Sequence, residues 1–136
     1  MNSYFLDTSV VIDCIRGKKE TVRFISDLKA SLYINYIVIA ELSEGIYRVK
    51  DSKSIEVGID AFINGMDGVF PINYNVSKLF GKIRADLKEK GQIIEDFDIL
   101  IGATCIENNI PIITLNRKHF NKIQGFEVFT PDDLKN

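Results

Sequence analysis

The sequence contains few of the residues that build disulfide frameworks or thiolate metal sites. Its 136 residues include two cysteines, one histidine, three prolines and no tryptophan. Cys14 and Cys105 both lie in apolar helical segments, without the spacing of a disulfide framework or a zinc site. We therefore expect both to be small buried hydrophobic residues in a reducing compartment.

Long apolar runs and a large excess of one charge are also missing. No stretch reaches the ~18 uncharged apolar residues that a membrane helix needs. The first residues carry no basic cluster, and Asp7 and Asp13 interrupt their apolar run, so we expect neither a signal peptide nor a membrane anchor. The net charge of −2 excludes a strongly basic nucleic-acid coat. These features predict a cytoplasmic protein in which any nucleic-acid contact is local.

The composition is that of a globular protein, with 46% hydrophobic and 26% charged residues. The length suits one domain with a substantial core, so we expect a single domain over residues 1–136. Short apolar runs alternate with segments of helical periodicity, which favours a parallel sheet covered by helices on both faces. The strand candidates are residues 4–6, 32–36, 69–72, 110–114 and 126–129.

One stretch, residues 94–105, has an acidic start and an almost wholly apolar continuation. This pattern predicts a helix buried against the sheet, with Asp96 and Asp98 in its first turn. Acids are favoured there because the backbone N–H groups and the helix dipole stabilise negative charge. Only one of the two can be the cap, so the other needs a separate explanation.

Other polar side chains follow the predicted strands. Asp7 leaves the first strand, Glu41 lies roughly one turn into the helix after the second, and Asn116 follows the strand that ends at Thr114. The carboxyl ends of parallel strands meet at one edge of a sheet, where ligands bind. Asp98 joins this group only if its helix begins near the same edge.

Three carboxylates cannot share one small site unaided. Two charges ~4 Å apart repel by roughly 4 kcal/mol at an effective dielectric constant of 20. A divalent cation removes that cost, and an all-oxygen ligand set suits Mg²⁺ or Mn²⁺ better than Zn²⁺. Such sites most often act on phosphate esters.

Four segments in this order resemble the motifs of PIN domains, and in particular the VapC-type toxin ribonucleases of bacterial toxin–antitoxin pairs. They extend from the first predicted strand to the strand that ends at Thr114, although each motif is weak by itself. The segments are residues 4–12 (YFLDTSVVI), 40–42 (AEL), 96–103 (DFDILIGA) and 114–116 (TLN).

The resemblance implies a three-layer α/β/α sandwich with a central, mainly parallel sheet. It also implies a metal-dependent endoribonuclease that forms a homodimer and is inhibited by a small antitoxin. Carried over by position, Asp7, Glu41 and Asp98 would bind Mg²⁺ or Mn²⁺, and Asn116 would occupy the fourth catalytic position. That position is often Asp in the family, so the number of metal ions stays open. Gly102 stands where Ala is commoner, and we expect this difference to matter little.

Each of the site residues also has a simpler interpretation. Asp7 could cap the following helix, and Glu41 could extend to solvent from the edge of its helix. Thr8 and Ser9 either orient Asp7 or serve as ordinary caps. Asp96 is either an acid beside the metal ligands or the substrate, or a simple N-cap.

The basic residues near the carboxyl terminus also allow two interpretations. We expect His119, the only histidine, to be an ordinary surface residue rather than a general base. Arg117, Lys118 and Lys122 either form a solvated loop or contact phosphate groups of a nucleic acid. For a homodimer, the apolar patch would come from the helix with Phe62 and Met66 or from the helix with Leu79 and Ile83.

Three other functions compete with this one. A phosphoacceptor domain needs paired acids after the first strand and a Lys after the last full strand, and the sequence has neither. A phosphatase of the Asp-x-Asp type fails because Ser9 occupies the second Asp position. A catalytically weakened PIN-fold module that binds RNA or protein stays open, because Asn116 departs from the common acid.

Overall fold

The sheet is parallel throughout in the computed structural model, which describes residues 2–135. Its strand order is β3-β2-β1-β4-β5. The pairing confirms the predicted parallel sheet. The strands are β1 (Asn2–Leu6), β2 (Ala30–Asn35), β3 (Gly68–Phe70), β4 (Ile112–Ile113) and β5 (Val128–Phe129).

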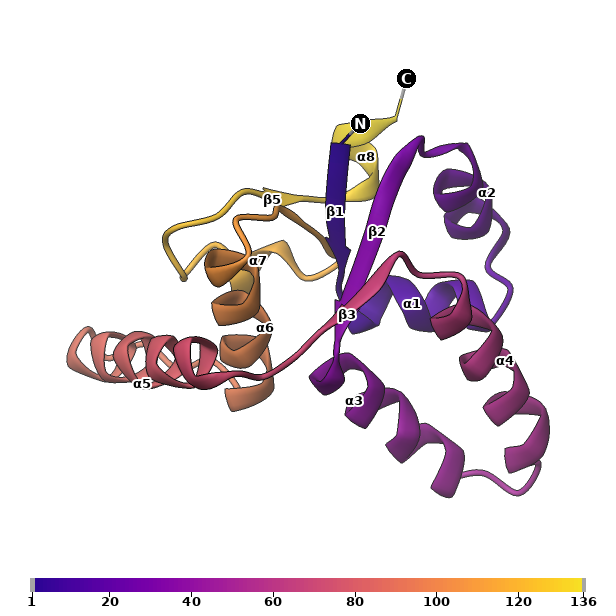
Figure 1. The fold of residues 1–136 in the computed structure, drawn as a ribbon, viewed down its shortest axis with the longest axis horizontal. Coiled ribbons are helices and arrows are strands. Elements are labelled where there is room, and N and C mark those ends of the chain that lie inside the picture. Colours follow the sequence, from indigo (N-terminus) through magenta and orange to yellow (C-terminus); the bar gives the residue numbers. More distant parts are fainter. Residues whose placement is uncertain (1, 136) are drawn as a thin grey trace.

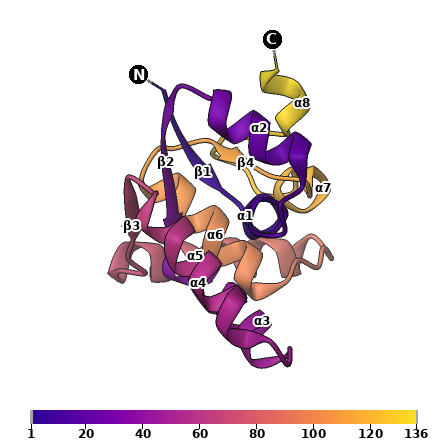
Figure 2. The ribbon, with the colours of Figure 1, turned by 90° about the vertical axis from the view of Figure 1, so that its right-hand side faces the viewer.

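Helices cover both faces of this sheet. Figures 1 and 2 show α1, α2 and α4 on one side and α5 and α6 on the other, while α3 and α4 project together as an arm. The three-layer α/β/α architecture is therefore confirmed. The longer helices are α1 (Thr8–Ile15), α2 (Lys19–Asp27), α3 (Tyr36–Tyr47), α4 (Ser52–Asn64), α5 (Tyr74–Glu89) and α6 (Asp96–Glu107), and the short ones are α7 (Arg117–Phe120) and α8 (Pro131–Leu134).

The strand order places a topological switch at β1. The chain runs outward from β1 to β2 and β3, then returns across the sheet to form β4 on the other side of β1. Leu6 is in register with Ile113. The residues that follow them, Asp7 and Thr114, therefore leave the sheet side by side at the position where parallel α/β folds bind ligands.

The core surrounds β1 and β4, where Phe5, Leu6, Ile112 and Ile113 have no exposed surface. Burying side chains of this size contributes roughly 1.5–3 kcal/mol each. The predicted burial of the apolar part of α6 is confirmed, and it includes Cys105. Both cysteines are free, although Cys14 is only half-buried; burial, aided by the charge of Asp13, raises the pKa of its thiol to about 11.

Two local features concern the ends of elements. Asn73 caps α5, because its side chain accepts a hydrogen bond from the Val76 N–H at 3.0 Å. The segment after β4, expected to be a loop, contains the helical turn α7. No helix among the described residues is long and apolar enough to span a membrane.

Gly102 packs closely against the turn after α7. A Cβ atom at this position would lie 3.0 Å from Cδ1 of Ile123, which is buried in the turn after α7. This is closer than ordinary van der Waals contact, so Ile123 would have to move. The glycine thus lets the segment after β4 approach α6 closely.

The two helices considered for self-association offer similar surfaces. Phe62 and Met66 are partly buried and pack against the hydrophobic core. Leu79 and Ile83 on α5 are also partly buried, and α5 packs mainly on α6. The helix that supplies the apolar patch of a homodimer stays a prediction.

A buried polar contact connects the two helices that carry candidate site residues. The Asn35 side chain caps α3 by accepting from the Val38 N–H at 3.0 Å. Its amide also donates to the Thr104 hydroxyl of α6 at 2.9 Å. Both residues have no exposed surface. This contact fixes α3 relative to α6.

Replacing Thr104 by Val should destabilise the protein by about 1–3 kcal/mol, because it leaves the buried Asn35 amide without an acceptor. Urea denaturation would measure the change in the free energy of unfolding. In an Asn35→Ala background the same Thr104 substitution should cost less, because the donor is already gone. Equal costs in both backgrounds would show that the contact contributes nothing.

Candidate active site

Asp7 is a buried carboxylate at the end of β1, with only 3% of its surface exposed. Its backbone occupies the N-cap position of α1, but its side chain makes no cap hydrogen bond. Instead its Oδ2 atom accepts from the Ser9 hydroxyl at 2.8 Å and from the Thr114 hydroxyl at 2.7 Å. The alternative in which the Asp7 side chain caps the helix is therefore wrong.

The same hydroxyl groups hold the chain that leaves β4. The Thr114 hydroxyl accepts from the Asn116 N–H at 2.9 Å, and the Ser9 hydroxyl accepts from the Leu115 N–H at 3.2 Å. Asn116 is therefore fixed beside Asp7 through its backbone. Its side chain is exposed and makes no cap hydrogen bond within the described residues. Ser9 orients Asp7, as one of its two interpretations predicted.

Glu41 lies half-buried on α3, and its Oε1 atom accepts from the Thr8 hydroxyl at 2.7 Å. It does not simply extend to solvent. Burial raises the pKa of the Glu41 carboxyl, and the negative charges of Asp7 and Asp98 raise it further, while the Thr8 hydrogen bond opposes them. Thr8 therefore orients Glu41 rather than Asp7.

Asp98 lies in the first turn of α6, and α6 does begin near the edge where Asp7 lies. Burial raises the pKa of the Asp98 carboxyl, and the charge of Asp7 adds to this effect. The hydrogen bond with His119 and its charge act in the opposite direction. The charges of Asp7 and Asp98 therefore act on Glu41, and the charge of Asp7 acts on Asp98.

His119 is a surface residue, as expected, but it also contacts one of the site acids. Its Nδ1 atom lies 3.0 Å from Oδ2 of Asp98, although 52% of its side chain is exposed. The helical turn of α7 after Asn116 directs it toward α6. A helix signal in residues 116–120 would have suggested this contact, but the segment is too short to show periodicity.

Asp96 is not the N-cap of α6. Glu95 occupies the N-cap position of α6, and Asp96 instead forms an exposed ion pair with Arg84, with Nε and Oδ1 2.8 Å apart. Glu95 is the acid that sequence reasoning overlooked. Its charge contributes to the raised pKa values of both Glu41 and Asp98.

Comparison with known families decides what kind of domain this is. Residues 4–125 match the PIN domain. This chain belongs to the PIN-domain family. The resemblance seen in the four sequence motifs is therefore confirmed.

Curated relatives of this PIN domain extend over nearly the whole chain. Ribonuclease VapC of Rickettsia bellii is 35% identical over 127 residues, which cover 92% of this chain and 93% of the relative. The tRNA(fMet)-specific endonuclease VapC of Salmonella typhimurium is 26% identical over 129 residues, covering 94% and 97%. These matches support the VapC-type resemblance.

Two solved structures of similar proteins have the same fold as this chain. The VapBC2 complex of Rickettsia felis, bound to a promoter DNA fragment, superposes with a TM-score of 0.86 at 24% identity, covering 94% of this chain and 98% of that one. The DNA-bound VapBC of Salmonella typhimurium gives a TM-score of 0.85 at 24% identity, covering 96% and 99%.

The chemistry of this PIN-domain site suits a divalent cation. The acids supply only oxygen donors, and within the described residues neither Asp7 nor Glu41 pairs with a Lys or Arg. Burial raises the pKa values of the Glu41 and Asp98 carboxyls, and the negative charges nearby raise them further. However, no three acid, His or Cys side chains in residues 2–135 lie close enough together to hold an ion as they stand. A shared coordination sphere stays a prediction.

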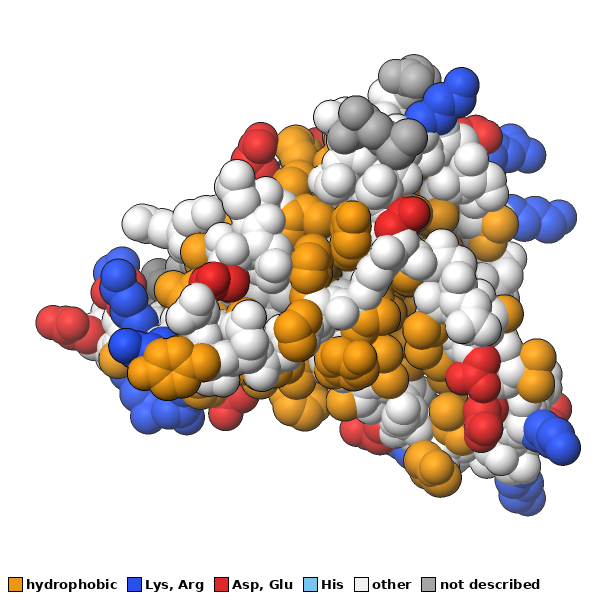
Figure 3. Space-filling view, viewed as in Figure 1, with side chains coloured by type: hydrophobic (Ala, Val, Ile, Leu, Met, Phe, Trp, Pro, Cys, Tyr) orange, Lys and Arg blue, Asp and Glu red, His pale blue; other side chains and the backbone are white. Residues whose placement is uncertain are grey.

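Two hollows of about 570 Å³ each differ in their relation to these acids. Figure 3 shows hydrophobic side chains gathered over β1 and near β3, where one hollow is lined by Tyr4, Tyr33 and Phe70 and contains no site acid. The other lies among α1, α3 and α4 and includes Glu41, with Arg48 also in its lining. Of these two hollows, only the second has a site acid in its lining.

Replacing Glu41 by Gln should raise the melting temperature of the protein in EDTA at pH 7.5. In the folded protein the pKa of Glu41 is higher than the usual carboxyl pKa. Ionised Glu41 therefore destabilises the fold, and the free energy of unfolding falls as the pH rises from the usual pKa through the pKa of the folded state. Below that usual pKa both states are protonated, so the advantage of Gln should disappear. Thermal melts from pH 3.5 to 8 would measure this.

The matched control is Glu44→Gln, which changes an exposed Glu on the same helix that pairs with Arg48. It should lower the stability slightly, by about 0.3–0.5 kcal/mol. A Glu41→Gln protein that melts lower than the unmodified chain at pH 7.5 would contradict the electrostatic account.

Proposed function

We propose that this PIN domain is a metal-dependent endoribonuclease, the toxin component of a type II toxin–antitoxin pair. The observation that carries the proposal is the buried Asp7 carboxylate at the topological switch, within electrostatic reach of Glu41 and Asp98. The curated relatives are named as ribonucleases and a tRNA endonuclease, which supports RNA as the substrate class.

In this proposal Asp7, Glu41 and Asp98 hold Mg²⁺ or Mn²⁺, with Asn116 beside them at the fourth catalytic position. The cation would supply positive charge that makes water more acidic and offsets the charge of the scissile phosphate. Glu41 and Asp98 suit this role because burial and mutual repulsion already disfavour their charged forms without a cation.

The hydroxyl groups and His119 position these carboxylates. Thr114 and Ser9 hold one oxygen of Asp7, which leaves its Oδ1 atom available. Thr8 holds Oε1 of Glu41, and His119 holds Oδ2 of Asp98, so each acid retains one oxygen without a side-chain hydrogen bond within the described residues. Three oxygens from three elements are thus available for a ligand.

Asp98→Asn should lower RNA cleavage at least ~100-fold, because it removes a charged oxygen ligand while preserving shape. Cleavage by the unmodified chain should require Mg²⁺ or Mn²⁺ and should stop with EDTA. The control is Asp96→Asn, which changes the exposed acid paired with Arg84 and should leave cleavage within about threefold. A fluorescent RNA assay would measure all three.

The outcomes separate the proposal from its alternative. Cleavage that survives thorough chelation, or full cleavage by the Asp98→Asn protein, would refute the metal mechanism. An unmodified chain that binds RNA without cutting it would instead identify a catalytically weakened PIN-fold binding module.

We also propose a small antitoxin as partner and a homodimer as the assembly. The relative of known structure from Klebsiella pneumoniae is a toxin–antitoxin complex, which supports this extension to the present chain. The hollow that includes Glu41 is the surface where a bound partner would block access to the acids. A cytoplasmic location stays a prediction.

Light scattering of the purified chain should give twice the chain mass of 15.4 kDa at micromolar concentration. Leu79→Arg on α5 should shift the mass toward that of one chain, because it places a charge in the candidate apolar patch. Lys90→Ala, at the far end of the same helix, serves as the control. A monomer mass for the unmodified chain would refute the homodimer.

A further inference from the structure

The stretch between α6 and Glu127, which includes β4, has an unusual charge distribution. Residues 108–126 contain no Asp or Glu, but they include Arg117, Lys118 and Lys122. The segment also contains Asn116 and His119, which lie beside Asp7 and Asp98. A positively charged stretch thus lies directly beside the site acids.

This segment is firmly anchored. Phe120 has no exposed surface and Ile123 only 4%, and the Phe120 ring contacts Phe126 edge to face with centroids 6.4 Å apart. The Asn116 N–H donates to Thr114, and His119 contacts Asp98. The segment is therefore held at a fixed position beside the site, and its cations are presented from a well-defined surface.

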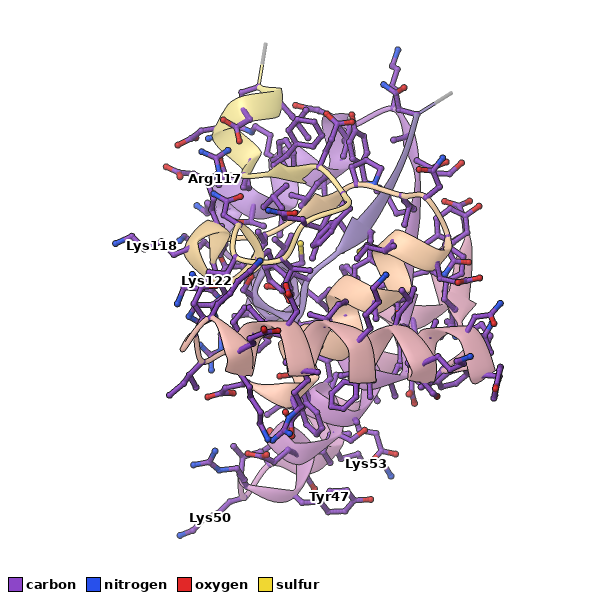
Figure 4. The ribbon with its side chains drawn as sticks, turned by 90° about the vertical axis from the view of Figure 1, so that its left-hand side faces the viewer. Tyr47, Lys50, Lys53, Arg117, Lys118 and Lys122 are labelled. Carbon is purple, nitrogen blue, oxygen red and sulfur yellow. The ribbon has the colours of Figure 1, made fainter. Side chains whose placement is uncertain are left out.

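The three cations differ in their partners. Arg117 pairs with Asp133 of α8. Lys118 and Lys122 are exposed, and within the described residues neither has an ion pair. Figure 4 shows the side chains of Arg117, Lys118 and Lys122 on one side of the molecule. Lys118 and Lys122 are thus free to take an anionic ligand.

A polyanionic substrate needs such a surface. The charges of Asp7, Glu41, Asp98 and Glu95 repel the phosphates on either side of the one being cleaved, and the net charge of −2 gives no general attraction. Cations that neutralise phosphates supply most of the affinity for a nucleic-acid backbone. Because the anchored segment shares residues with the site, its free lysines lie where those neighbouring phosphates would pass.

We propose that Lys118 and Lys122 are positioning residues that bind backbone phosphates of the RNA adjacent to the cleavage site. This inference rests on the proposed function and specifies how that site holds its substrate. The ion pair with Asp133 holds Arg117 toward α8, so the two lysines carry the contact.

The test compares the double variant Lys118→Ala/Lys122→Ala with the unmodified chain on a fluorescent single-stranded RNA. The control is Lys50→Ala/Lys53→Ala, which removes the same charge at the end of the arm that Figure 4 shows away from α7. A Lys118→Arg/Lys122→Arg protein tests rescue by retained charge. Cleavage kinetics give KM and kcat, and fluorescence anisotropy across a KCl series gives the salt dependence of binding.

We expect the alanine variant to raise KM about tenfold while kcat stays within about threefold. The slope of log affinity against log salt should fall by about 1.4, since each single-strand phosphate contact contributes about 0.7. The arginine variant should restore both values, and the control pair should change neither.

The outcomes distinguish this inference from the proposed function. Unchanged KM and salt slope in the alanine variant, or an equal effect of the control pair, would overturn the lysine assignment and leave RNA cleavage standing. An unmodified chain that binds RNA through these lysines without cleaving it would overturn the proposed function alone. Absence of RNA binding by the unmodified chain would overturn both.

Discussion

The contact between the Asp7 carboxylate and the Thr114 hydroxyl is the interaction on which the site depends. It joins the ends of β1 and β4 across 107 positions of sequence at a distance of 2.7 Å. A buried carboxylate is costly unless hydrogen bonds satisfy it. Thr114 and Ser9 provide those bonds and also hold the backbone that continues to Asn116, so one network stabilises the acid and fixes the neighbouring chain.

The site has an acidic region and a positively charged region side by side. The acids around Asp7 disfavour one another's ionised forms, which costs stability in the absence of a cation. Residues 114–126 carry positive but no negative side chains, and they meet the acids through His119. A site that acts on a phosphodiester benefits from both, because a metal requires anionic ligands and a polyanion requires cations.

Polar cross-links between helices explain how acids from separate elements keep their positions. Asn35 caps α3 and also donates to Thr104 of α6, so the helices carrying Glu41 and Asp98 share one buried contact. Gly102 allows Ile123 to approach α6 closely, and this brings the turn after α7 against the same helix. Small changes in packing at these positions would therefore move site residues that they do not touch.

The sequence by itself determined the parallel α/β fold, the burial of α6 and the position of Asp7 at a strand end, because periodicity and strand-end placement are local properties. It could not show that Asp96 pairs with Arg84, that Thr8 serves Glu41, or that His119 contacts Asp98. Those partners are separated by 12 to 33 positions, so only the tertiary structure decides which neighbour each side chain meets. Charge and hydrogen-bonding capacity are encoded in each residue, whereas the choice of partner depends on how the elements pack.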